Sequence, residues 1–177
     1  MAATTSAITN NVIWAEKALK YTGETLTMGA INRWEDIKRS KGAVLFAAPF
    51  MRVRTVAATI DAVRNKGTMK QLLLDMASIA EKAGCGNCAE QSAVAFSYLY
   101  HRRGHGGCPS IIEAMRFANG DHAFVVVGRA ADSDAAVPAT WGPDAVVCDA
   151  WLKKVFLPIE WVKYWPGMTP ELECRVE

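Results

Sequence analysis

The apolar residues in the first half of the chain recur every three or four positions, which is the spacing of one face of a helix. Four segments with this spacing are predicted helices: Asn11–Tyr21, Met28–Arg39, 53–65 and 68–82. Gly67 separates the last two, because glycine is a common stop signal. No unit repeats at a fixed period, which argues against a solenoid.

The pattern changes after Gly84, where a glycine-rich turn precedes a predicted helix over residues 87–103. One face of this helix carries mostly small side chains at offsets of four, seven and eleven: Cys88, Ser92, Ala95 and Leu99. A helix with such a face can lie close against a sheet. The segment Gly104-His105-Gly106-Gly107 ends it.

A β-hairpin is predicted around Asn119-Gly120, the preferred two-residue pair for a type I′ turn. It joins predicted strands over residues 110–118 and 121–128. The second strand is apolar throughout, so we expect it to be the more central one. His122 therefore lies near the turn end of a central strand.

A polar loop over residues 130–142 precedes a third predicted strand, residues 145–149, and residues 158–165 are expected to form a short helix. The fold class that follows is α+β. It has N-terminal helices and one central helix that carries Cys88, packed on an antiparallel sheet.

The length of 177 residues suits a single domain with a hydrophobic core. We expect it over residues 12–177, with a helical part at 12–83 and a helix-and-sheet part at 84–177. Residues 1–11 are small and polar and are expected to be a disordered tail, either a frayed terminus or an unfolded leader for a secretion apparatus.

Composition and charge exclude several classes of protein. With 51% hydrophobic residues, 21% charged residues and a net charge of +2, the chain has no field that would attract nucleic acid. The densest basic groups are expected to be solvated helix ends: Lys38-Arg39-Ser40-Lys41 and His101-Arg102-Arg103. The longest apolar run, Ala43 to Phe50, is interrupted by Pro49, so we expect a soluble protein with no membrane span.

The five cysteines are an odd number, and no apolar signal segment precedes them. Both observations argue against a disulfide scaffold of the secretory pathway. We therefore expect a reducing, cytoplasmic type of compartment, which a leader at residues 1–11 could also reach inside a host cell without a signal peptide.

The candidate chemistry centres on Cys88, which follows Gly84-Cys85-Gly86-Asn87 in the first turn of its helix. Unpaired backbone N–H groups there favour the thiolate, the reactive form. A thiol acyl-transfer site also needs a base and a group that orients the base. His122 is the candidate base, because burying a histidine in an apolar strand without a partner is costly.

Asp149, at the end of the third predicted strand, is the candidate orienting carboxylate. Its competitor Asp121 points to the opposite face from His122 if the strand is regular. The oxyanion of the intermediate would lie near the Cys88 backbone N–H. Asn87, Gln91 and Trp151 are further candidates for oxyanion or substrate contacts.

The order Cys88, His122 and Asp149 on a helix and two strands resembles papain-like and transglutaminase-like thiol enzymes. The segments Gly-Asn-Cys, Asp-His-Ala-Phe and Cys-Asp-Ala-Trp are most similar to cysteine-dependent toxin and effector domains of bacteria. The resemblance covers residues 84–151. It implies a papain-like fold, a Cys-His-Asp triad without a cofactor, and a protein substrate that is deamidated at glutamine, cleaved or transamidated. The similarity to effector domains implies a host protein as that substrate.

The chain departs from the family pattern at two positions. Many such enzymes carry an oxyanion-donating glutamine several residues before the nucleophile, where this chain has Ile79-Ala80-Glu81-Lys82, and only Gln91 lies nearby. The effector-like pattern also tends to have proline after the acidic residue, where this chain has Ala150.

Other interpretations remain open because Cys85-Gly86-Asn87-Cys88 is also a C-x-x-C motif. A thioredoxin-like pair would need a strand before the motif, where a helix is predicted. A non-catalytic papain-like binding module would have a buried structural thiol at Cys88. A zinc-stabilised interaction domain lacks a second paired motif. Its possible ligands are Cys85, Cys88, Cys108, Cys148 and His122.

Overall fold

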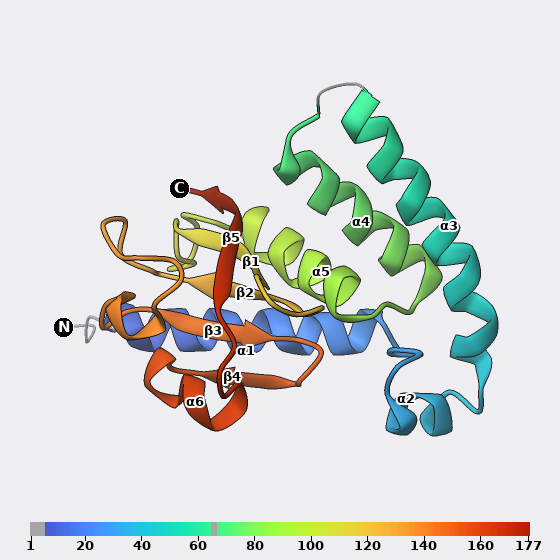
Figure 1. Cartoon of the computed structure of the whole chain (residues 1–177), viewed down its shortest axis with the longest axis horizontal. Helices are drawn as coiled ribbons and strands as arrows, with labels where there is room; N and C mark the ends of the chain where they lie inside the picture. Colours follow the sequence, from blue (N-terminus) through green and yellow to red (C-terminus); the bar gives the residue numbers. More distant parts are fainter. Residues whose placement is uncertain (1–5, 65–66) are drawn as a thin grey trace.

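The chain forms a set of helices, most of them in its first half, and an antiparallel sheet in its second half (Figure 1). The computed structural model describes residues 6–64 and 67–177, and within these it has six α-helices and five strands. The predicted α+β class is therefore confirmed.

Helix α1 (Ala7–Thr25) begins earlier than predicted. Ser6 caps it by accepting a hydrogen bond from the Thr9 backbone N–H at 3.4 Å. Asn11 is buried, and its Nδ2 donates to the Asp144 carbonyl at 2.7 Å. The predicted tail is therefore wrong over residues 7–11, and its first five residues lie outside the described residues.

The predicted helix Met28–Arg39 is wrong in its first half. Only α2 (Trp34–Arg39) is helical, and residues 28–33 form a loop in which Gly29 has a φ of +71°. Hydrogen bonds to a distant segment, described below, hold this loop out of the helix.

Helix α3 (Ala43–Arg64) starts ten residues before the predicted helix 53–65, whose last residue lies outside the described part. It continues through Pro49, so the expectation that this proline interrupts the apolar run is wrong. By length and composition alone, Ala43–Ala62 is long and apolar enough to cross a membrane.

Helix α4 (Met69–Ala83) confirms the prediction for residues 68–82. Its cap residue Thr68 accepts a hydrogen bond from the Gln71 N–H at 3.2 Å, and Gly84 ends it with a φ of +66°. Helix α5 (Cys88–Tyr100) confirms the central helix and ends three residues before the predicted limit at residue 103.

The five-stranded sheet is antiparallel throughout, in the order β4-β3-β2-β1-β5. Its strands are β1 (Ile112–Phe117), β2 (Ala123–Val127), β3 (Val146–Asp149), β4 (Lys154–Phe156) and β5 (Pro170–Val176). The central position predicted for the second strand of the hairpin is confirmed, because β2 is the middle strand. The pattern did not predict β4 and β5.

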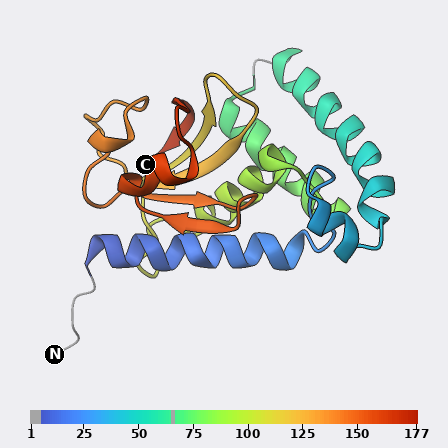
Figure 2. The ribbon, with the colours of Figure 1, turned by 60° about the horizontal axis from the view of Figure 1, so that its bottom comes forward.

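The two faces of the sheet carry different cores, because alternate side chains of a strand point to opposite faces. Helices α1 and α5 lie on one face, where Val125, Val127 and Val146 are buried (Figures 1 and 2). An aromatic cluster that includes Trp141, Trp161 and Trp165 packs on the other face. The short helix predicted at 158–165 is confirmed as a 3-10 turn, Pro158–Glu160, followed by α6 (Trp161–Tyr164).

The β1–β2 hairpin has the register that a two-residue connection at Asn119-Gly120 implies, but a different turn. Arg116 faces Ala123, and the Phe117 N–H donates to the His122 carbonyl at 3.0 Å. Neither Asn119 nor Gly120 has the positive φ that a type I′ turn requires, so that turn type is wrong. The Asn119 side chain instead accepts from the Thr169 N–H at 3.2 Å, which attaches the turn to the chain before β5.

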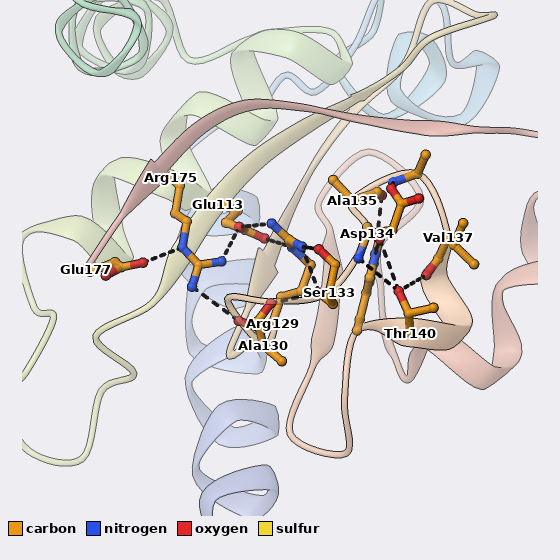
Figure 3. A network of polar contacts seen from close by, with 12 residues as sticks. Glu113, Arg129, Ala130, Ser133, Asp134, Ala135, Val137, Thr140, Arg175 and Glu177 are labelled. Carbon is orange, nitrogen blue, oxygen red and sulfur yellow. Dashed lines mark hydrogen bonds and ion pairs between the residues drawn. The ribbon is translucent and has the colours of Figure 1, made fainter.

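A buried charge network joins β1, β5 and the loop after β2 (Figure 3). The carboxylate of Glu113, fully buried, accepts from Arg129 Nε at 2.6 Å and Nη2 at 2.7 Å, and from Arg175 Nη1 at 2.7 Å. Arg129 also donates to the Ser133 carbonyl at 2.8 Å. The network attaches the C-terminal strand to the sheet.

Candidate active site

Cys88 is the first residue of α5, and the turn before it has no room for a side chain at Gly86. A Cβ at Gly86 would lie 2.6 Å from the Cβ of Glu90, which is closer than real contacts allow. The Glu90 carboxylate accepts from the Asn87 N–H at 2.9 Å. The Cys88 N–H, at the first helical position, has no partner within the helix.

His122 and Asp149 are directly hydrogen-bonded. His122 Nε2 lies 2.7 Å from Asp149 Oδ2, and this carboxylate is fully buried at the end of β3. Its other oxygen accepts from the Leu152 N–H at 2.8 Å. Because Nε2 is paired with Asp149, the imidazole has Nδ1 left for a second partner.

Cys88 and His122 line the same cavity. Burial alone lowers the pKa of His122, but the hydrogen bond to Asp149, the nearby Cys88 and the charge of Asp149 raise this pKa to about 9. Cys88 Sγ also lies 3.8 Å from the carbonyl oxygen of Asp121, whose side chain is exposed. The structure thus brings Cys88, His122 and Asp149 together. Asp121 lines both cavities at Cys88, but among the described residues its carboxylate makes no hydrogen bond with His122.

Stability should depend on pH through His122. Its pKa rises from 6.5 to about 9 on folding, so the folded chain binds the proton more tightly. The stabilisation is complete below about pH 6.5 and is lost as the pH rises through about 9. Between these limits, the unfolding temperature of the wild type should fall relative to that of His122→Gln, and a constant difference across the window would contradict this assignment.

Trp151 lies beside the His122 ring, with 5.5 Å between the ring centroids and an angle of 71° between the planes. Its Nε1 donates to Asn32 Oδ1 at 3.0 Å, and Arg33 donates to its carbonyl oxygen. Trp151 therefore packs against the imidazole and connects it to the loop at residues 28–33.

This loop is the part of the site that the sequence prediction missed. It runs beside the turn before Cys88: the Gly86 N–H donates to the Gly29 carbonyl at 3.0 Å, and the Ile31 N–H donates to Asn87 Oδ1 at 3.3 Å. The isolated Gly29 inside a helical pattern was the available signal.

The buried carboxylate of Asp36 stabilises the same loop. It accepts from the Ala30 N–H at 3.0 Å and pairs with Arg39 at 2.9 Å and Lys153 at 3.1 Å. Burial alone would raise the pKa of Asp36, but these partners hold it below its ordinary value.

The two candidate oxyanion donors have different roles. Asn87 is next to Cys88, and because its Oδ1 accepts from Ile31, its Nδ2 is the group that can donate to a ligand. Gln91 stabilises the turn before Cys88: its side chain points back toward the helix N-terminus, and its Nε2 donates to the Gly86 carbonyl at 2.8 Å. An oxyanion contact from the second hydrogen of Nε2 stays a prediction.

Two cavities share Cys88, which is 7% exposed, as a lining residue, and we call the two together the groove at Cys88. The first, of about 290 Å³, has an apolar wall from α4: Met69, Leu72, Leu73 and Met76. The second, of about 280 Å³, is polar and includes Asn32, Arg52 and Asn87. Both reach Cys88, and His122 lines the first.

The other cysteines are shielded from solvent to different degrees. Burial raises the pKa of the thiols of Cys85 and Cys174, that of Cys108 to about 11 and that of Cys148 to about 12. In the described ranges, 6–64 and 67–177, no group of three or more His, Cys, Asp or Glu side chains could hold a metal ion. Neither finding supports a zinc site at the C-x-x-C motif.

Comparison with protein-family models, curated proteins and solved structures yields no match for this chain. The function proposed below therefore depends on the site geometry and on the residues that compose it.

Proposed function

We propose that the protein is a cysteine-dependent hydrolase or acyl transferase that acts on amide bonds of a protein substrate through a thioester. The observation that carries the proposal is that Cys88 and His122 line one cavity and that His122 is hydrogen-bonded to the buried Asp149. A thiol at a helix start, an imidazole beside it and a carboxylate on the far ring nitrogen are the parts that thiol acyl transfer needs.

The same residues supply each step of the reaction. The Cys88 thiolate attacks the amide carbon, and the oxyanion accepts from the Cys88 N–H and the Asn87 Nδ2 group. The C–N bond then breaks as the His122 imidazolium gives its proton to the leaving amine or ammonia. Finally His122 takes a proton from water, which attacks the thioester and releases the acid and the Cys88 thiol.

The groove supports a segment of a protein as the substrate. It consists of one cavity with an apolar wall from α4 and one polar cavity, and Cys88 lines both, so we propose that a substrate chain passes across the thiol. In keeping with the sequence resemblance, we place the protein among papain-like effector enzymes. Its activity would be glutamine deamidation or proteolysis of a host protein in a reducing compartment, with transamidation where an amine replaces water.

Alkylation tests the nucleophile. With iodoacetamide near neutral pH, we expect one fast adduct, mapped to Cys88, because the other described thiols are shielded or have raised pKa values. The fast adduct should vanish in Cys88→Ala and persist in the matched control Cys108→Ala. A Cys88 thiol no more reactive than free cysteine would instead support the binding module, which its low exposure favours.

Intact-mass spectrometry of candidate host proteins then tests the reaction. Wild type and Cys88→Ala are incubated with each candidate, with and without an added amine. Deamidation, cleavage and transamidation each change the substrate mass differently, and the change should be absent with the variant.

A further inference from the structure

Helix α3 exposes a large apolar surface at the outer edge of the molecule, with α4 between it and α5 (Figure 1). Six of its large apolar side chains are between 44% and 78% exposed: Leu45, Phe46, Phe50, Val53, Val56 and Ile60. Its opposite face, with Val44, Ala48 and Met51, is buried in a small core. We call these six residues the α3 stripe.

Charged residues, most of them cations, flank the α3 stripe on both sides. At 3.6 residues per turn, the stripe is about 140° wide; Arg52 lies at one border, and Arg54 and Asp61 lie at the other. Lys82 of α4 lines a groove together with Arg54 and Phe50. No carboxylate in the described part of the chain lies within 4.0 Å of the charged groups of Arg52, Arg54 or Lys82.

The helix is neither a core helix nor suited to spanning a bilayer. Only 17% of the apolar window Ala43–Ala62 is buried, whereas the core helix of a soluble protein is mostly buried. Arg52 and Arg54 lie midway along the helix. If α3 spanned a bilayer, their charges would lie near its centre, where burying a charge costs the most free energy. Removing α3 from the molecule would also expose the core around Met51.

A second copy of the chain is a poor fit for the α3 stripe. Val53 is at the middle of the stripe, between Arg52 and Arg54. In a two-fold antiparallel pair of α3 helices centred on Val53, Arg52 of each copy would meet Arg54 of the other as like charges. An apolar stripe with mostly cationic borders matches instead the boundary between acyl chains and anionic headgroups.

We propose that α3 is an interfacial helix that docks the protein on the surface of an anionic membrane, with the α3 stripe in the acyl boundary and Arg52, Arg54 and Lys82 on the headgroups. Because Arg52 also lines the groove at Cys88, docking places that groove close to the bilayer. The proposal does not depend on catalysis.

Vesicle co-sedimentation tests the docking. The protein should bind vesicles of phosphatidylcholine with about one third phosphatidylserine, and added salt should weaken this binding. Phosphatidylcholine alone should bind it much less. Replacing both Phe46 and Phe50 with serine should reduce the partition coefficient about tenfold or more. Arg54→Gln and Lys82→Gln should each reduce it about fivefold.

A matched control replaces two exposed apolar residues outside α3, Ile159→Ser with Val162→Ser, and should bind as the wild type does. Thermal unfolding of each variant reports on its fold. Absence of vesicle binding at low salt, or equal binding by the Phe46/Phe50 variant, overturns the proposal. So does self-association of the wild type that the same variant abolishes, because the α3 stripe would then be a protein interface.

Discussion

Replacing His122 with alanine is expected to lower amide-bond turnover by about 10²- to 10⁴-fold, because the variant has no group to exchange protons with the substrate. The loss can be measured before a substrate is known. Without the imidazolium, Cys88 should be alkylated roughly ten- to a hundredfold more slowly at neutral pH, since a free thiol is only a few per cent thiolate there. Quenching the alkylation reaction at set times and analysing each sample by intact-mass spectrometry gives this rate.

His105→Ala is the matched control, because His105 is exposed in the loop after α5 and lines neither cavity at Cys88. Its alkylation rate should equal that of the wild type. If His122→Ala also leaves the rate unchanged, His122 does not activate the thiol, and the proposed triad is wrong.

Asp149→Asn separates the effect of the Asp149 charge on His122 from the role of Asp149 in orienting the His122 ring. The asparagine oxygen can still accept from His122 Nε2, but one of the charges that raise the pKa of His122 to about 9 is gone. The pKa of His122 measured by NMR titration should therefore fall while the ring stays in place. Asp149→Ala removes both effects and should resemble His122→Ala in reactivity.

Replacing Glu113 with alanine is expected to reduce the free energy of unfolding by about 3–5 kcal/mol. The change leaves Arg129, 3% exposed, and the half-buried Arg175 without the carboxylate that accepts from both (Figure 3). Breaking a buried pair by removing one partner is costly, because the remaining charge stays out of water. Urea denaturation followed by circular dichroism measures the loss.

Glu171→Ala is the control for that experiment. Glu171 also pairs β5 with β1, through Arg116 at 2.6 Å, but both side chains are about half exposed. Its removal should cost no more than about 1 kcal/mol, since water solvates both groups. Equal losses for Glu113→Ala and Glu171→Ala would show that burial of the network contributes little to stability.

The sequence predicted the parts of the fold that depend on near neighbours. Helices α4 and α5 follow from apolar spacing, and the structure adds the caps of α4 at Thr68 and Gly84, which also act within a few residues. The register of the β1–β2 hairpin follows in the same way from its short connection. The type of turn does not, because Asn119 bonds to Thr169 near the other end of the chain.

Where distant segments meet, the sequence prediction was incomplete or wrong. Residues 28–33 have helical spacing, but hydrogen bonds between this segment and Gly86, Asn87 and the buried Asp36 hold it in a loop conformation. Strand β5 was missed although Leu172, Cys174 and Val176 alternate with charged residues, which is a strand pattern. Its pairing could not be read from the sequence, because its partner β1 is far away along the chain.

For the site, residue chemistry alone selected Cys88, His122 and Asp149, because few side chains suit those roles and strand alternation disfavoured Asp121. Only the tertiary structure decided that Gln91 supports the turn, that Trp151 packs on His122, and that the 28–33 loop borders the groove. The physical reason is the range of the interactions. Helical period and turn preference act between residues close in sequence, whereas a groove forms from segments that folding alone brings together.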